Sequence, residues 1–131
     1  MTRHCSTLLV LGAFALTGLA ACGSSSGGSA QNCPAKVDTK TATGGAITVC
    51  GSDIKYDVAT IKAQPGPLKV TFVNGGSIYH TFKINNTSLD LKANSGKTES
   101  GTVTLSKGTY DFECTVPGHS SAGMKGTIVV G

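Results

Sequence analysis

The sequence predicts an all-β protein that folds as a two-sheet β-sandwich of about seven to eight strands. From residue 47 onward, short segments with alternating polarity or many β-branched residues follow one another, and none has a convincing helical period. Turn sequences rich in Gly, Pro and Asn separate these segments. The 18 glycines of the 131-residue chain suit the many tight turns of a sandwich built from short strands.

Each expected strand has its own pattern. In the segment 68–73, Leu68, Val70 and Phe72 share one face, and in the segment 109–114, Tyr110 and Phe112 alternate with acidic residues. The segment 80–84 also alternates, whereas β-branched residues mark the strands expected at 47–50, 56–61, 98–105 and 125–130. The clearest turns between strands are Gln64-Pro65-Gly66-Pro67, Asn74-Gly75-Gly76 and Ser106-Lys107-Gly108.

The segment between the last two expected strands holds a thiol, an imidazole and a thioether. Cys114, His119 and Met124 have the spacing Cys-x4-His-x4-Met, and His80 opens an earlier strand. Beyond residue 4, these are the only histidines and the only methionine of the chain. A thiolate, two imidazoles and a weak axial thioether are the ligands of a blue-copper site, whereas structural zinc needs four strong donors. The pattern therefore predicts one copper ion that changes between Cu(I) and Cu(II).

Neighbouring residues fit this interpretation. Pro117-Gly118 turns the chain just before the loop histidine, and Gly123 lets the backbone approach closely before the methionine. Thr81 and Thr115 each follow a ligand residue and are candidates for hydrogen bonds that tie the two ligand segments together. The alternative is that both are ordinary strand threonines.

The N-terminus has the features of a bacterial lipoprotein signal peptide at residues 1–21. Arg3 supplies a positive charge, and the apolar stretch at 8–19 is too short to span a bilayer. Small residues precede Cys22, which is expected to carry a lipid after cleavage; the alternative is an ordinary signal peptide with Cys22 incidental. Residues 22–32 then form a flexible Gly/Ser linker and 33–131 the folded domain. The expected location is extracytoplasmic, with a lipid anchor in a bacterial membrane, at the cell surface or in the periplasm.

The remaining cysteines are assigned by inventory. Cys5 leaves with the signal peptide, so Cys33 and Cys50 are left to pair in an oxidising compartment. Such a bridge would stabilise the fold by about 3 kcal/mol in the chain-entropy model. A second metal site is the competing interpretation, but no further histidine or cysteine is left to complete one.

The charge pattern excludes one class of partner. The chain has a formal net charge of +4, with no run of basic residues and little aromatic content, so nucleic-acid binding is not supported. The lysines form either a solvated surface or a field that steers an acidic redox partner.

Residues 110–130 resemble the C-terminal signature of the cupredoxins, the plastocyanin/azurin family of type 1 copper proteins. Their sequence is Tyr-Asp-Phe-Glu-Cys-Thr-Val-Pro-Gly-His-Ser-Ser-Ala-Gly-Met-Lys-Gly-Thr-Ile-Val-Val. Its ligand spacing is similar to that of rusticyanin and sulfocyanin. The resemblance covers about residues 47–131 and implies a Greek-key β-sandwich with Cys114, His80 and His119 equatorial and Met124 axial. The chain departs from the family pattern by Thr81, where members often carry Asn, and by the Cys33/Cys50 pair.

The resemblance also implies a function. We expect a one-electron carrier that is not an enzyme and that moves electrons, as a monomer, between membrane-associated partners such as a cytochrome, an oxidase or a reductase. Electrons would leave through the loop histidine and an apolar patch formed by His119, Pro117, Gly118 and Ala122. The alternative function is extracytoplasmic copper storage or delivery, which the lone methionine and the lack of a His/Met-rich tail make less favourable. A copper oxidase or nitrite reductase would need many more histidines.

Overall fold

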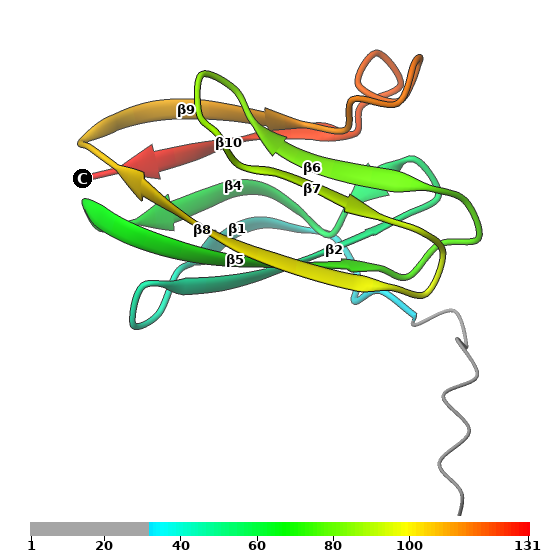
Figure 1. The fold of residues 1–131 in the computed structure, drawn as a ribbon, viewed down its shortest axis with the longest axis horizontal. Coiled ribbons are helices and arrows are strands. Elements are labelled where there is room, and N and C mark those ends of the chain that lie inside the picture. Colours follow the sequence, from blue (N-terminus) through cyan, green and yellow to red (C-terminus); the bar gives the residue numbers. More distant parts are fainter. Residues whose placement is uncertain (1–31) are drawn as a thin grey trace, which may run out of the picture.

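The computed structural model describes residues 32–131, which form two packed β-sheets and contain no helix (Figure 1). The predicted signal peptide, Cys22 and most of the predicted linker lie outside the described residues. Within residues 32–131, no helix is present that could cross a membrane. The strands are β1 (Val37–Thr41), β2 (Ala46–Ser52), β3 (Lys55–Tyr56), β4 (Val58–Ala63), β5 (Gly66–Asn74), β6 (His80–Ile84), β7 (Asp90–Ala93), β8 (Thr98–Leu105), β9 (Gly108–Glu113) and β10 (Lys125–Val130).

The two sheets differ in size and both are mixed. The larger has the order β1-β4-β10-β9-β6-β7 and the smaller the order β3-β2-β5-β8. Strand β4 pairs in parallel with β1 and β10, and β2 pairs in parallel with β5, whereas the remaining neighbours are antiparallel. This arrangement confirms the predicted two-sheet sandwich.

Residues 32–131 contain ten strands, whereas seven to eight were expected. β1 and β7 lie in polar segments with weak strand patterns, and the expected strand at 56–61 is divided at Asp57. On one side of Asp57, β3 pairs with β2 in the small sheet, and on the other, β4 enters the large sheet. One apolar segment thus crosses from one layer to the other, which its alternation alone does not reveal.

The core between the sheets is aromatic at its centre. Tyr56, Phe72, Phe82 and Phe112 are at most 1% exposed and come from strands of both sheets. Phe82 stacks on Phe112 at 4.8 Å between ring centroids, and Tyr56 meets both rings edge-on. Such contacts add stability beyond that of apolar burial, and they fix the distance between β6 and β9, the strands that lead to the predicted ligands.

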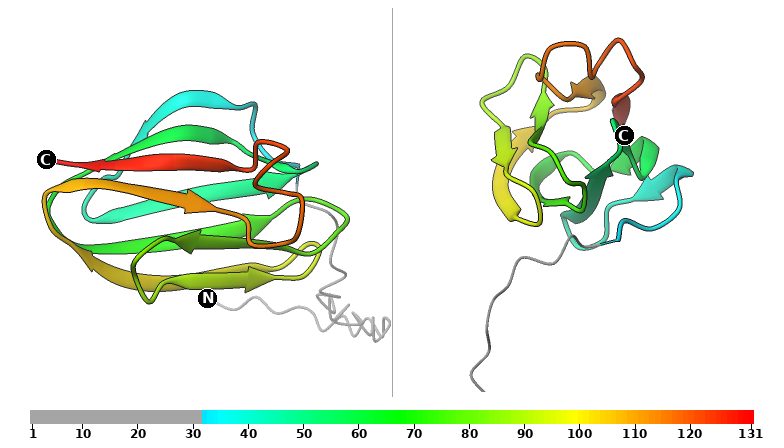
Figure 2. Two further views of the ribbon diagram at one scale, coloured as in Figure 1. Left: turned by 90° about the horizontal axis from the view of Figure 1, so that it is seen from above. Right: turned by 90° about the vertical axis from the view of Figure 1, so that its right-hand side faces the viewer.

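Two loops lie at one end of the sandwich. The β9–β10 loop, residues 115–124, and the β5–β6 loop, residues 75–79, both lie at the right-hand end in Figure 1 and face the viewer in the right panel of Figure 2. Residues 32–36 reach the domain at the same end, where they line a groove together with the β2–β3 turn and Gly75, Gly76 and Ser77.

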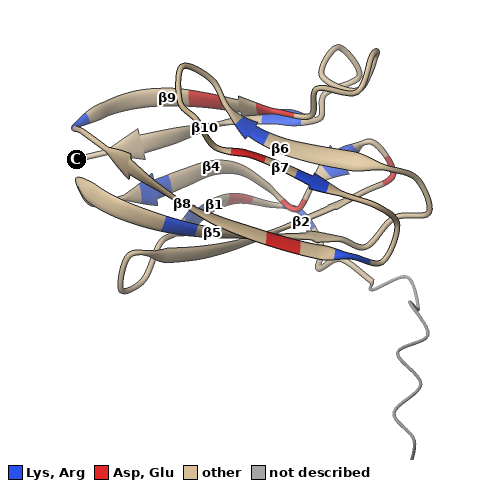
Figure 3. Cartoon of the chain, in the orientation of Figure 1, with Lys and Arg blue, Asp and Glu red and all other residues tan. Residues whose placement is uncertain are grey.

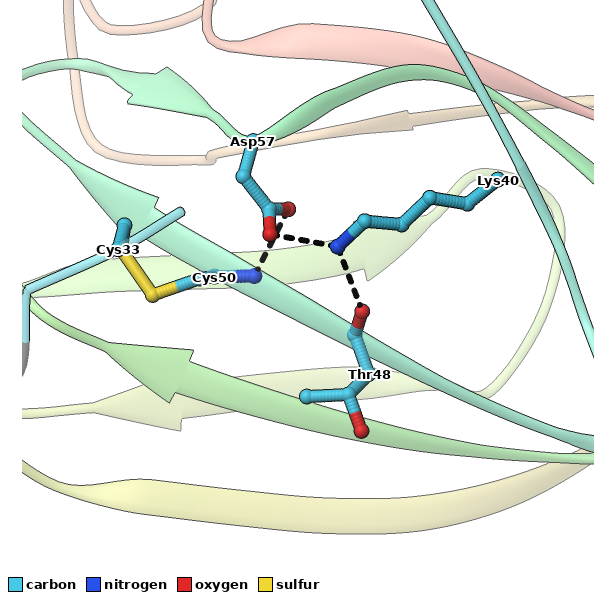
Figure 4. Close-up of polar contacts among 5 residues, drawn as sticks. All are labelled: Cys33, Lys40, Thr48, Cys50 and Asp57. Carbon is cyan, nitrogen blue, oxygen red and sulfur yellow. Dashed lines mark hydrogen bonds and ion pairs between the residues drawn. A yellow bond between two sulfur atoms is a disulfide. The ribbon is translucent and has the colours of Figure 1, made fainter. Parts of the chain in front are cut away.

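Asp57 lies between β3 and β4, where the chain changes sheet, and it binds residues of β1 and β2 (Figure 4). Its carboxylate accepts a hydrogen bond from the Cys50 amide at 3.0 Å and forms an ion pair with Lys40. The Lys40 ammonium group also donates a hydrogen bond to the Thr48 carbonyl at 3.1 Å. Cys50 is in turn bonded to Cys33 by a disulfide, which confirms the predicted pairing. The carboxylate is 2% exposed, so its partners compensate for its desolvation.

Replacing Asp57 by Ala should destabilise the fold by about 2–3 kcal/mol, because the buried Cys50 amide and the Lys40 ammonium both lose their acceptor. Urea denaturation measures this change. Asp90→Ala is the matched control, because Asp90 pairs with Lys92 at the surface and should contribute less than about 1 kcal/mol. Equal effects of the two substitutions would contradict the role assigned to Asp57.

Candidate metal centre

The fold brings the predicted ligand residues to one end of the molecule. His80 is the first residue of β6, Cys114 directly follows β9, and His119 and Met124 lie in the β9–β10 loop. All four are buried, with His119 the most accessible at 8% exposure. Cys114 carries a free thiol. The histidine that is distant in sequence therefore meets the loop, as the sandwich topology requires.

Three of these side chains converge on one point. The Nδ1 atoms of His80 and His119 lie 3.2 Å apart, the His119 Nδ1 lies 3.5 Å from the Cys114 Sγ, and all three donor atoms lie within 4.8 Å of one another. Three donors placed trigonally around a shared ion, at about 2.0–2.3 Å from it, would be about 3.5 Å apart. Two imidazoles and one thiolate at these separations fit one copper ion.

The protonation state of His80 suits metal binding. Burial, and next the neighbouring His119, lower the pKa of His80, while the charge of Asp53 opposes this shift to a smaller extent. The His80 ring is therefore neutral at neutral pH, and a neutral imidazole is the form that offers a lone pair to a metal.

The β9–β10 loop is shaped by backbone hydrogen bonds and two glycines. The Cys114 amide donates to the Met124 carbonyl, and the Met124 amide donates to the His119 carbonyl, each at 3.0 Å. Gly118 and Gly123 have φ angles of +85° and +104°, which strain any other residue. The hydrogen bond between Cys114 and Met124 thus continues the β9–β10 ladder to the base of the loop, and the loop turns both His119 and Met124 inward.

Met124 is fully buried, and the structure shows what makes room for it. A Cβ atom at Gly51 would lie 2.9 Å from the Met124 methyl group and 2.9 Å from the Phe72 ring. Only a glycine at this place in β2 allows the thioether to pack between the loop and the core.

The two predicted threonines meet beside the Cys114 sulfur. The β6–β9 ladder pairs Lys83 with Glu113, so the same register places Thr81 opposite Thr115. There the ordinary backbone bonds are replaced. The Thr81 amide donates to Cys114 Sγ at 3.4 Å, and the Thr115 amide donates to Thr81 Oγ1 at 2.8 Å. The two hydroxyl oxygens are 3.0 Å apart, so side chains tie the ligand segments together where the ladder opens.

Sequence reasoning missed a buried asparagine that holds the β5–β6 loop. Asn74 was interpreted only as part of a turn, but its side chain is fully buried. Its amide donates to the Ile78 and Ala93 carbonyls, both at 2.8 Å, and its oxygen accepts the Gly76 amide at 3.0 Å. The signal for this role was weak, because asparagine before Gly-Gly is also what an exposed turn requires.

Gly76 lies directly against the first histidine. A Cβ atom at Gly76 would lie 3.2 Å from the His80 Nε2, a buried atom without a hydrogen-bond partner among the described residues. The loop thus fixes the back of the imidazole ring while its Nδ1 faces the centre.

The predicted exit patch lies on the loop surface. Pro117, Gly118 and Ala122 are exposed around His119, which is itself only slightly exposed. Under the loop, Ser120 donates a hydrogen bond of 2.6 Å to Glu113, and this bond, followed by one from Asn85, lowers the pKa of the Glu113 carboxyl. The loop is thereby tied to the strand that precedes Cys114.

A β-sandwich with two imidazoles and a thiolate at one end defines the class of cupredoxin-type copper proteins. The sequence of residues 43–131 matches the protein-family model described as copper binding proteins, plastocyanin/azurin family. The chain therefore belongs to the plastocyanin/azurin family of copper-binding proteins.

Individual relatives agree with this class. The copper-resistant cuproprotein CopI of Rubrivivax gelatinosus is 29% identical over 105 residues, and the match spans 63% of this chain and 63% of the length of CopI. The reduced auracyanin of Roseiflexus castenholzii has a TM-score of 0.61 at 22% identity, covering 69% of this chain and 98% of auracyanin. Rusticyanin from Thiobacillus ferrooxidans has a TM-score of 0.59 at 21% identity, and the match covers 75% of this chain and 85% of rusticyanin. At these identities the two structures establish the fold.

Replacing Asn74 by Ala should destabilise the protein by about 3 kcal/mol, because three buried backbone groups lose a partner. The same change should weaken copper binding, since the loop behind His80 loosens. Denaturation and copper titration measure the two effects. Asn94→Ala in an exposed turn is the control and should change stability by less than about 0.5 kcal/mol. Unchanged copper affinity in a destabilised Asn74→Ala variant would contradict the link between this loop and the site.

Proposed function

We propose that this protein is a one-electron carrier with a type 1 copper site. His80, Cys114 and His119 would form the equatorial plane, and Met124 would be the weak axial ligand. Copper supplies a one-electron couple between Cu(I) and Cu(II). The observation that carries the proposal is the convergence of two Nδ1 atoms and one Sγ atom, all buried and held by strand ends and by a loop closed on itself.

The surroundings favour electron transfer over catalysis. Three strong protein donors and a buried thioether leave no strong position open for a substrate. Backbone hydrogen bonds, the threonine pair and the aromatic core hold the donors in place, which limits rearrangement when the charge of the site changes. For these reasons we propose that the protein is not an enzyme.

The two loops that surround the site contain no charged residue. Residues 115–124 contain no Lys, Arg, Asp or Glu, and neither do residues 75–79, whereas charges of both signs are distributed along the strands (Figure 3). Ile78 and Tyr79 are 47% and 41% exposed at this end. We infer that redox partners dock here through apolar contact around His119, Pro117, Gly118 and Ala122, and that the lysines have at most a steering role.

The entry point of the chain suits a membrane-associated partner. Residues 32–36 lie at the end of the sandwich that carries the metal site, and the Cys33–Cys50 disulfide fixes them there. A lipid on Cys22 would therefore tether the protein, outside the cytoplasm, by the end through which electrons pass. Proteolysis and membrane fractionation of the wild type and of Cys22→Ser test this anchor; an unchanged membrane fraction would exclude it.

Copper storage or delivery is the second candidate function, and the relative CopI supports it, because that protein is named for copper resistance. The two functions differ in how fast the metal leaves. A carrier should keep copper for hours against a Cu(I) chelator, whereas a delivery protein should release it within minutes. Stopped-flow measurement of electron exchange with a small redox mediator, on the same sample, gives the rate of electron transfer, which should be fast for a carrier.

The purified protein loaded with Cu(II) should show an intense visible thiolate-to-copper band and narrow EPR hyperfine splitting. Cys114→Ala should remove the band entirely, because the band requires the thiolate. Thr98→Ala, at an exposed position of β8, should leave it unchanged. A pale spectrum of ordinary Cu(II) in the wild type would exclude the type 1 geometry and place copper delivery first.

Met124→Leu tests the axial position. The substitution nearly conserves volume and should leave the fold intact, but it removes a weak donor to Cu(II) and should raise the reduction potential while keeping the blue band. Potentiometric titration measures the change. If the potential and the EPR spectrum stay those of the wild type, Met124 is not a ligand and serves only to fill the core.

A further inference from the structure

Tyr56 connects the small sheet to the strand that carries His80. It belongs to β3, is 1% exposed, and its hydroxyl donates a hydrogen bond of 2.6 Å to the carbonyl oxygen of Thr81 in β6. The two residues lie in different sheets, so this bond crosses the core of the sandwich. It ends one residue after His80 and next to the thiolate of Cys114.

The Thr81 carbonyl needs this partner because of the register. The amide and carbonyl of one strand residue point to the same neighbouring strand, and the side alternates along the strand. The Ile84 amide donates to Leu89 on the β7 side and the Asn85 amide donates to Asp111 in β9, so the amide and carbonyl of Thr81 point to β9. At Thr81 the backbone ladder has opened, and the amide donates to Cys114 Sγ instead. Without the Tyr56 hydroxyl, the carbonyl would be a buried acceptor with no donor.

The ring of Tyr56 is itself held firmly. It makes edge contacts with Phe72, Phe82 and Phe112 at centroid distances of 6.1, 5.5 and 5.3 Å. Phe82 follows Thr81, and Phe112 lies two residues before Cys114, so the ring touches both strands that bring the thiolate and its donors together. Burial, and next the charges of Cys114 and Glu113, raise the pKa of Tyr56, so the hydroxyl remains a donor.

We propose that Tyr56 is a positioning residue for the copper thiolate: its hydroxyl holds Thr81 so that the amide and hydroxyl of Thr81 stay directed at Cys114 Sγ. This inference rests on the type 1 site proposed above. Thr81 Oγ1 lies 3.7 Å from that sulfur. Donors to the sulfur stabilise the reduced state, because Cu(I) withdraws less electron density from the thiolate and leaves it more negative. Tyr56 therefore raises the reduction potential of the site.

Tyr56→Phe removes one oxygen atom and keeps the aromatic contacts. In copper-loaded protein equilibrated with one redox mediator, the ratio of Cu(I) to Cu(II) should fall about threefold, as expected for the partial loss of a hydrogen bond, and the thiolate-to-copper band should shift. In copper-free protein, the Thr81 amide should exchange with solvent faster. The matched control is Tyr110→Phe, whose hydroxyl bonds Ser106 in the β8–β9 turn; it should change none of these quantities.

A second variant tests the same route. Thr81→Val keeps the carbonyl that Tyr56 holds and removes the hydroxyl directed at the sulfur, so the Cu(I) to Cu(II) ratio should fall here too. A wild-type ratio and band in Tyr56→Phe, or in Thr81→Val if Tyr56→Phe does not fold, overturns the proposal even if stability is reduced. If the wild type has no blue band, the proposed function fails. Amide exchange then decides the role of Tyr56, and unchanged exchange at Thr81 overturns it.

Discussion

The Cys114 sulfur, which lies between two hydrogen-bonded strands, imposes the main constraint on this structure. β6 and β9 pair in register only as far as Lys83 and Glu113, and beyond that point a sulfur atom occupies the space of a backbone bond. The backbone groups left over must still be paired, because each unpaired buried group costs about 1–3 kcal/mol. The Thr81 hydroxyl oxygen accepts the Thr115 amide in place of a backbone carbonyl, and the Tyr56 hydroxyl donates to the Thr81 carbonyl from across the core.

The need to pair the Thr81 carbonyl also explains why the chain changes sheet between Tyr56 and β4. Tyr56 has to reach β6 from the small sheet, and the next residue, Asp57, directs the chain into the large one. A buried carboxylate at this corner is tolerated because the Cys50 amide and Lys40 both bind it. Cys50 also carries the disulfide to Cys33, so the entry of the chain, the sheet crossing and the support beneath the thiolate are neighbours in one small region.

The sequence predicted what depends on local spacing. The run from Cys114 to Met124 contains three donors, a Pro-Gly turn and a glycine of positive φ, and all of these act within ten residues, so their arrangement could be inferred from the chain alone. Asn74 and Tyr56 act through partners 19 and 25 residues away, Ala93 and Thr81, and no local pattern distinguishes them from a turn asparagine or a core tyrosine. The strand expected at 56–61 was wrong in extent for the same reason, because the break at Asp57 is decided by the second sheet.

The hydrogen-bond inventory around the thiolate explains how threonine can serve at position 81. The Thr81 hydroxyl oxygen accepts the Thr115 amide and lies 3.0 Å from the Thr115 hydroxyl. If the Thr115 hydroxyl also donates to it, the hydroxyl proton of Thr81 is free to bond the Cys114 sulfur. Each donor in this series of hydrogen bonds then has an acceptor. A donor that already accepts two bonds is polarised toward its own acceptor. Two short hydroxyl side chains acting in series can therefore do for the sulfur what one longer amide side chain would do alone.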